Sequence, residues 1–294
     1  VTGASGGLGA ETARALAACG ARVTIAARDM EKAESAAAEI RSSTGNSGVD
    51  VLGLELTVPQ SVRDFAKQWL ATHDELHLLI NNAGLMASPL ERTREGWEYQ
   101  FATNHLGHFL LTGLLAPALV RGAPSRVVNL SSAGHRMSPV VFDDIHFESR
   151  PYDKWESYGQ SKTANILFSV ALTARLAAKG VTANAVHPGM IMTELGRHMG
   201  QQDLEDLMSK RPADTEMKWK SVEAGAATSL WGATAAELEG RGGLYLEDCG
   251  VAKAKRTDEE MEGYAAYALD ADAAERLWRV SEETLGAVFD FNNL

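Results

Sequence analysis

Tyr158 and Lys162 are a tyrosine and a lysine whose types and spacing suit acid–base chemistry. They open a segment with the apolar periodicity of a helix that ends at Gly180, so we expect them on one helix face, one turn apart. A free phenol titrates near ~10, and a neighbouring ammonium lowers that pKa towards the range of a general acid or base. Because such a pair also arises by chance on many helices, other features of the chain must decide.

A glycine turn with the spacing Gly3-xxx-Gly7-x-Gly9 stands near the start of the chain and leads into an alanine-rich helix. Glycines in such a turn let the backbone approach a pyrophosphate and direct a helix N-terminus at its negative charge. Val1 and Thr2 before the turn resemble the end of a strand. We therefore expect the first strand to begin before Val1.

The residues after the next predicted strand, residues 22–26, bear on the choice of cofactor. In a dinucleotide-binding unit, a carboxylate at this strand end binds the ribose 2′-hydroxyl, whereas an arginine pairs with a 2′-phosphate. Here the strand end is Ala27, and Arg28 follows it. Arg28 therefore favours NADP over NAD, although a solvated arginine is the alternative and the adjacent Asp29 points the other way.

Strand and helix patterns alternate along most of the chain. Further strands are predicted at residues 51–56, 76–80, 126–130, 181–186 and 243–246. Helices are predicted at residues 10–19, 31–41, 59–73, 95–119, 157–177 and 221–236. This alternation predicts an α/β fold with a doubly wound parallel sheet of about seven strands, helices on both faces, and a single domain over residues 1–294. Ligands in such sheets lie beyond the carboxyl ends of the strands.

Two segments fall outside the alternation. Residues 190–220 are polar and rich in methionine, which predicts a flap over a site, and residues 253–294 are expected to form a C-terminal helical segment.

Ser131 and Ser132 follow a predicted strand at the ligand edge, but no GxSxG pattern surrounds them, so a serine nucleophile elbow is excluded.

Composition excludes several classes of protein. Hydrophobic residues at 45% and charged residues at 23% are typical of a globular chain, and the net charge of −11 argues against nucleic acid as a partner. Cys19 and Cys249 have no CxxC partner, and no carboxylate or cysteine completes a metal site with His105 and His108. No run approaches the ~20 apolar residues of a membrane span, so a cytoplasmic location is expected.

The glycine turn, Asn-Asn-Ala-Gly at residues 81–84, Ser132, Tyr158-xxx-Lys162 and Pro188-Gly189 occur in one order over essentially the whole chain. Together they resemble the short-chain dehydrogenase/reductase family, whose fold is the Rossmann fold, and the glycine spacing resembles its classical branch. The long segment between Ser132 and Tyr158, with residues 27–29 and 165–168, resembles the retinol-dehydrogenase-like and protochlorophyllide-reductase-like group. That resemblance implies bulky apolar substrates and supports NADP.

The resemblance also implies roles for individual residues. Tyr158 would be the acid/base, and Lys162 would lower its pKa and bind the nicotinamide ribose. Ser132, more than Ser131, would hydrogen-bond the substrate oxygen, and Asn104 would hold a water that links Lys162 to solvent. The residues implied to contact the cofactor are Gly3, Ser5, Gly7, Leu8, Gly9, Glu55, Leu56, Asn82, Ala83, Gly84, Pro188, Gly189, Ile191 and Thr193. The family commonly has aspartate where this chain has Glu55.

We therefore predict an oxidoreductase that prefers NADP(H) over NAD(H) and moves a hydride between nicotinamide and the carbonyl or alcohol of an apolar small molecule. Two alternatives remain: reduction of a conjugated carbon–carbon double bond with the same residues, and a non-catalytic protein that senses NADP. Relatives often pair through the helices that begin near Glu95 and Ser157, so a homodimer or homotetramer is expected by analogy.

Overall fold

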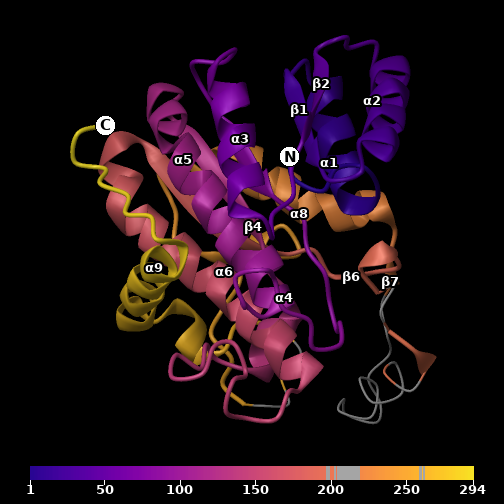
Figure 1. Ribbon diagram of the computed structural model, residues 1–294. Coiled ribbons are helices and arrows are strands. Elements are labelled where there is room, and N and C mark those ends of the chain that lie inside the picture. The colour runs from indigo at the N-terminus through magenta and orange to yellow at the C-terminus, as the bar shows by residue number, and fades with distance from the viewer. Residues whose placement is uncertain (197–198, 202, 204–218, 258–259, 261) are drawn as a thin grey trace.

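A parallel sheet with helices on both faces forms the centre of the computed structural model (Figure 1). The structure describes residues 1–196, 199–201, 203, 219–257, 260 and 262–294. The predicted flap falls largely on residues 197–198, 202 and 204–218, which lie outside this part of the chain. Its described ends, β6 (Met190–Ile191) and β7 (Trp219–Lys220), pair with each other in parallel.

Two sets of parallel strands make up the sheet. β1 (Val23–Ala27) pairs with β2 (Val49–Gly53). The second set runs in the order β3 (Leu78–Asn81), β4 (Ser125–Leu130), β5 (Val181–His187) and β8 (Tyr245–Glu247), with β9 (Gly250–Val251) antiparallel to β8.

The first residues of the chain join the two sets. Thr2 forms a parallel bridge with Ala26 of β1, and its N–H donates to the carbonyl of Ile80 in β3 at 3.0 Å. Within the described residues, the parallel order is therefore β2, β1, residues 1–2, β3, β4, β5 and β8. The prediction of a doubly wound parallel sheet is confirmed.

Alternate residues of the strands point to opposite faces of the sheet. One face packs against α1 (Gly7–Ala18), α2 (Met30–Thr44) and α8 (Val222–Thr234). The other packs against α3 (Pro59–Leu70), α5 (Gly107–Arg121) and α6 (Lys154–Leu176), and α9 (Ala271–Leu285) lies outside α6. Thus Val127 and Val128, neighbours in β4, belong to different apolar clusters. Among the described helices, none has both the length and the apolar character needed to span a bilayer.

The helix predicted at residues 95–119 begins later and is interrupted. Its first turn, α4 (Tyr99–Phe101), begins after Glu98, whose carboxylate accepts the N–H groups of Gln100 and Phe101 at 3.0 and 2.7 Å. A π-helix, Ala102–Leu106, then separates α4 from α5. Such single π-turns add a residue to a helix and often mark functional positions.

Candidate active site

Tyr158 and Lys162 lie in the first half of α6, as predicted, and both are buried, with 2% and 3% of their surface exposed. The turn after β4 passes directly over the tyrosine: a Cβ on Gly134 would lie 2.6 Å from Cε1 of Tyr158 and 3.4 Å from Oγ of Ser132. Ser132 accepts the N–H of Gly134 at 3.0 Å, and its hydroxyl is near enough to Tyr158 to lower the pKa of the phenol. A glycine at 134 therefore lets Ser132 and Tyr158 meet.

The pKa of Tyr158 beside Lys162 differs from the sequence prediction, which expected it to be lowered. Burial raises the pKa of Tyr158 to about 12, and the hydrogen bond from Ser132 offsets only part of that rise. Burial also lowers the pKa of Lys162 to about 7. The ammonium of Lys162 donates to the carbonyl of Leu130 at 2.9 Å and lies 5.7 Å from the centre of the tyrosine ring. In this state, desolvation outweighs any stabilisation of the phenolate by Lys162.

Asn104 stands in the middle of the π-helix and connects two other parts of the site. Its amide donates to the carbonyl of Leu85 and to the hydroxyl of Ser161 at 3.0 and 2.9 Å, and its carbonyl accepts the N–H of Leu85 at 3.0 Å. Leu85 follows the Asn-Asn-Ala-Gly loop after β3, and Ser161 precedes Lys162 on α6. Asn104 therefore holds the loop against the helix that carries Tyr158 and Lys162.

Gly84 leaves a small space between Asn104 and Lys162. A Cβ on Gly84 would lie 3.0 Å from Oδ1 of Asn104 and 3.5 Å from Nζ of Lys162. The amide oxygen and the ammonium therefore border the same position, and any larger side chain at residue 84 would fill it.

The glycine turn packs directly on the loop after β3. A Cβ on Gly3 would lie 2.8 Å from Cα of Ala83, and a Cβ on Gly9 would lie 2.4 Å from Nδ2 of Asn82. Gly3 has a φ of +65°, a conformation that favours glycine. Thr2, which the sequence analysis did not assign to the site, accepts the N–H groups of Asn82 and Ala83 at 2.9 and 3.0 Å.

The N-terminus of α1 fits the anionic group of a dinucleotide. Its N-cap is Gly6, which offers no side chain to the first-turn N–H groups, and a Cβ there would meet no atom within 4 Å. Helix N-termini with open N–H groups favour phosphate. The described residues therefore fit the cofactor that the glycine spacing predicts.

The predicted adenosine side of the site contains Arg28 and Glu55 at the ends of neighbouring strands. Nη1 of Arg28 lies 3.4 Å from Oε2 of Glu55, and the arginine side chain is 66% exposed. Asp29, which was the argument against NADP, accepts the N–H of Lys32 at 3.1 Å and caps α2. The Asp29 carboxylate therefore serves as the N-cap of α2, which weakens the argument that it selects NAD.

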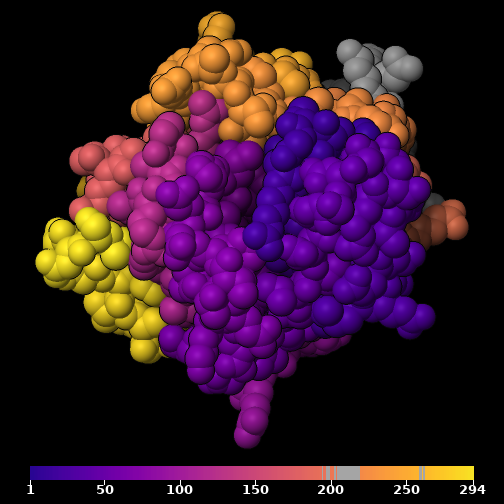
Figure 2. Space-filling model, turned by 90° about the horizontal axis from the view of Figure 1, so that it is seen from above, coloured from indigo at the N-terminus to yellow at the C-terminus, as the bar shows by residue number. Residues whose placement is uncertain are grey.

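The segment after β5 lies over the glycine turn. A Cβ on Gly7 would lie 3.6 Å from Cγ2 of Thr193, and a Cβ on Gly225 of α8 would lie 2.6 Å from Ile191 and 2.7 Å from Leu8. Figure 2 shows orange residues, the colour of α8, beside the indigo N-terminal residues. The structure thus places Ile191 beside Leu8, and Thr193 beside the glycine turn. Leu56 is buried against Gly107 instead, with its carbonyl 2.4 Å from a Cβ placed there.

Two histidines, the buried His135 and the half-buried His187, hold the turns around Ser132 and were missed by the sequence analysis. Nδ1 of His187 accepts the N–H groups of Ala133 and Gly189 at 3.3 and 3.4 Å, which ties the turns after β4 and β5 together. His135 forms hydrogen bonds with the carbonyl of Ser132 at 2.7 Å and the N–H of Ala265 at 3.1 Å. Burial lowers the pKa of His187 to about 3 and that of His135 to about 4, so both rings are neutral.

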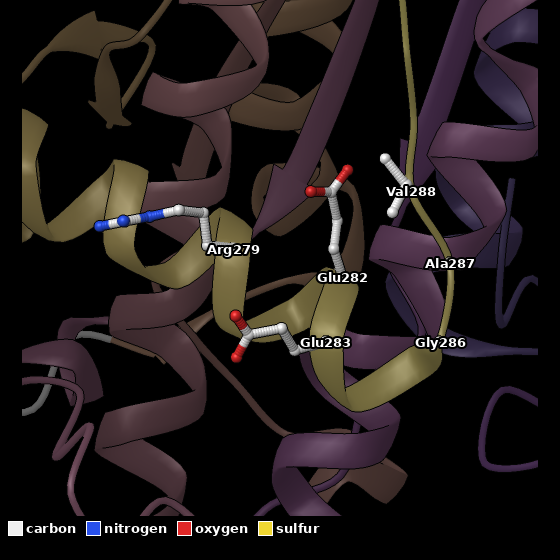
Figure 3. A pocket seen from close by; sticks show the side chains of 6 residues that line it. All are labelled: Arg279, Glu282, Glu283, Gly286, Ala287 and Val288. Carbon is white, nitrogen blue, oxygen red and sulfur yellow. The ribbon is translucent and has the colours of Figure 1, made fainter.

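Two surface hollows flank this centre. One of about 620 Å³ lies at the start of α6, one turn before Tyr158. Its lining residues are Ala87, Pro89, Leu90, Tyr152, Asp153, Lys154 and Trp155. The other, of about 340 Å³, is formed by the end of α9 and residues 286–288, and Figure 3 shows its side chains on this one helix and the chain that follows it. Neither hollow is lined by a predicted site residue, and no cluster of three metal-ligating side chains occurs among the described residues.

Comparison with known proteins agrees with this geometry. The short chain dehydrogenase family model matches residues 1–204. Retinol dehydrogenase 12 of Mus musculus is 46% identical over 286 residues, which cover 97% of this chain and 85% of that protein.

Solved structures extend the likeness. The crystal structure of an uncharacterized protein from Mycobacterium paratuberculosis has a TM-score of 0.74 and 34% identity, and covers 99% of this chain and 93% of its own. The Pseudomonas aeruginosa RhlG/NADP active-site complex has a TM-score of 0.66 and 27% identity, and covers 84% of this chain and 92% of its own.

The chain therefore belongs to the short-chain dehydrogenase/reductase family. Within that family it falls in the retinol-dehydrogenase-like group, as the sequence motifs predicted. It is an NAD(P)-dependent alcohol dehydrogenase or ketoreductase whose fold binds a nicotinamide cofactor.

Proposed function

We propose that the protein is an NADP(H)-dependent alcohol dehydrogenase or ketoreductase for apolar substrates, with Tyr158 as its acid/base. The observation that carries this proposal is the close approach of Ser132 and Tyr158, which both border Gly134 at the carboxyl end of β4, one helical turn from Lys162. Two hydroxyls that converge at this edge can both hydrogen-bond one substrate oxygen.

The bound nicotinamide supplies or accepts the hydride. In reduction, Tyr158 donates its proton to the substrate oxygen, and Ser132 stabilises the negative charge that develops on that oxygen. Since the pKa of Tyr158 is about 12, the phenol carries the proton that reduction requires at neutral pH. Lys162, with a pKa of about 7, exchanges protons in the same pH range, and the space at Gly84 would hold the water that links it to Asn104.

The preference for NADP rests on Arg28. Its guanidinium is exposed at the end of β1, and its partner Glu55 is held in place by Thr57, which donates from its N–H and its hydroxyl to Oε1 at 3.1 and 2.8 Å. We infer that a 2′-phosphate would replace this loose ion pair, since guanidinium binds phosphate through a matching fork of donors. The NADP found in the similar Pseudomonas structure supports this choice.

The apolar substrate class is supported by the hollow at the start of α6. Ala87, Pro89, Leu90 and Trp155 give it an apolar part, beside the polar Tyr152, Asp153 and Lys154. Trp155 lies about one helical turn before Tyr158 on α6. The relative from Mus musculus is named a retinol dehydrogenase, which fits an apolar alcohol.

Replacement of Tyr158 by Phe tests the proposal directly. Turnover of aliphatic and polyene aldehydes with NADPH should fall at least ~100-fold, the usual contribution of an acid catalyst, while the affinity for NADPH stays within ~3-fold. Tyr99→Phe is the control, because Tyr99 lies in α4 and does not line the hollow. Full activity in Tyr158→Phe would refute the role of the phenol.

A further inference from the structure

His108, in the first turn of α5, joins two parts of the site through its side chain alone. It is 2% exposed, and its ring has a polar partner at each nitrogen. Nδ1 lies 3.0 Å from the main-chain carbonyl oxygen of Asn104, and Nε2 lies 2.9 Å from the hydroxyl oxygen of Thr2. Burial lowers its pKa to about 4, so the ring is neutral at physiological pH.

The partners fix which nitrogen carries the proton. A carbonyl oxygen can only accept, so Nδ1 of His108 is the donor to Asn104, and Nε2 of the neutral ring must then accept. The proton of the Thr2 hydroxyl is therefore directed at Nε2. Its other candidate acceptor, the carbonyl of Ile80, lies farther away, at 3.4 Å.

Because the Thr2 hydroxyl donates its proton to His108, the lone pairs of its oxygen can accept hydrogen bonds from the loop after β3. They accept the N–H groups of Asn82 and Ala83 at 2.9 and 3.0 Å. An unbroken series of hydrogen bonds thus runs from the carbonyl of Asn104 through His108 and Thr2 to two consecutive N–H groups of the loop.

We propose that His108 is a positioning residue that holds the loop of Asn82, Ala83 and Gly84 in register with Asn104. The inference rests on the proposed function, in which this loop holds the cofactor ribose and Asn104 holds the relay water. His108 touches neither cofactor nor substrate in this role. It sets the spacing between the loop and the π-helix, and therefore the width of the space at Gly84.

His105 provides a matched control on the same stretch of chain. It is as buried as His108, and burial lowers its pKa to about 3. Its Nε2, however, pairs with the hydroxyl of Ser281 on α9 at 2.8 Å, and its Nδ1 has no partner. Loss of His105 therefore disturbs the packing of α9, while loss of His108 disturbs the loop.

The test compares His108→Asn, His108→Gln and His105→Asn in the intact protein. The amide of Asn can replace Nδ1 as donor to Asn104 but does not reach Thr2, whereas Gln reaches Thr2 as an acceptor. Hydrogen exchange is measured without cofactor. The amides of Asn82 and Ala83 should exchange ~10-fold faster in His108→Asn, because the loss of about one buried hydrogen bond makes local opening of the loop that much more frequent. Exchange in His108→Gln and His105→Asn should stay within ~2-fold of the parent protein.

A cofactor titration supplies the second readout. The Kd for NADPH should rise ~5- to 10-fold in His108→Asn and in Thr2→Val, and the double variant should show no further rise, because both changes break the same series of bonds. An additive double variant, or unchanged exchange in His108→Asn, would overturn the inference. If the parent protein binds no NADPH, the proposed function fails, and the exchange experiment still decides the role of His108.

Discussion

The ammonium nitrogen of Lys162 lies over the face of the Tyr158 ring, 5.7 Å from its centre, and donates its hydrogen bond to the carbonyl of Leu130. The two groups are one helical turn apart, yet burial moves their pKa values in opposite directions, to about 12 for the phenol and about 7 for the ammonium. The site is thus prepared to donate a proton, and the group that titrates near neutral pH is the lysine.

The rate of carbonyl reduction at saturating NADPH should fall as the pH rises through about 7. Burial lowers the pKa of Lys162, so the side chain is charged below that pH and neutral above it, and only the charged form can return a proton towards the phenol. Lys162→Arg keeps its charge over this range and should flatten the profile at a lower maximum rate. Lys179→Arg, in the short 3-10 helix Ala177–Lys179 that follows α6, is the control. An unchanged profile in Lys162→Arg would assign the titration to another group.

Arg28→Ala should weaken NADPH binding ~10- to 100-fold and leave NADH binding within ~2-fold, because we propose that the guanidinium binds the 2′-phosphate, which NADH lacks. Fluorescence titration with both cofactors measures the two constants. Arg22→Ala is a matched control, since Arg22 is also exposed on the β1 side and pairs with Asp50 at 3.1 Å. If the unmodified protein binds NADH as tightly as NADPH, Arg28 does not select the cofactor.

Acid should destabilise the protein below about pH 6.5 because three buried histidines and the half-buried His187 must remain neutral in the fold. Burial lowers the pKa of His105 and His187 to about 3 and that of His108 and His135 to about 4. The unfolded chain binds these protons near pH 6.5 and the folded chain does not, so stability is lost as the pH falls through 6.5.

Urea unfolding between pH 7 and 5 measures this loss. The slope should approach about 1.4 kcal/mol per pH unit for each histidine that titrates only on unfolding. His105→Gln removes one such group and should reduce the slope by about 1.4 kcal/mol per pH unit, the contribution of one proton. A free energy of unfolding that stays constant from pH 7 to 5 would contradict the burial of these neutral rings.

The fold and the close approach of Ser132 to Tyr158 could be predicted from the sequence because they depend on order and local pattern. Strand and helix periodicities predict the parallel sheet, and turns at the carboxyl ends of parallel strands meet at one edge. Ser132 and Tyr158 therefore lie close together, although neither motif is specific alone.

The remaining features depend on contacts between distant residues. The π-helix around Asn104 changes the hydrogen-bond spacing without changing the composition of the helix, so its position was not predicted. The partner of His108 is Thr2 and that of His105 is Ser281, and neither pairing has a local pattern. The pKa of Tyr158 was predicted in the wrong direction for this state, since its degree of burial outweighs the effect of the neighbouring lysine.

Gly84→Ala should lower kcat more than it raises the Kd for NADPH. The added methyl group would lie 3.0 Å from Oδ1 of Asn104 and 3.5 Å from Nζ of Lys162, so it would occupy the place proposed for the relay water. We expect kcat to fall on the order of 10-fold, since proton transfer by a positioned group contributes at least that much, and the Kd to change less than ~3-fold.

Gly250→Ala is the matched control for this substitution, because its Cβ would meet only the carbonyl of Glu247 at an ordinary 3.5 Å, in a hairpin on β8. Single-turnover measurements separate the hydride step from later proton exchange. If Gly84→Ala raises the Kd in proportion to any loss of kcat, the glycine serves the cofactor loop alone. If kcat falls while the Kd stays constant, the space between Asn104 and Lys162 takes part in proton transfer.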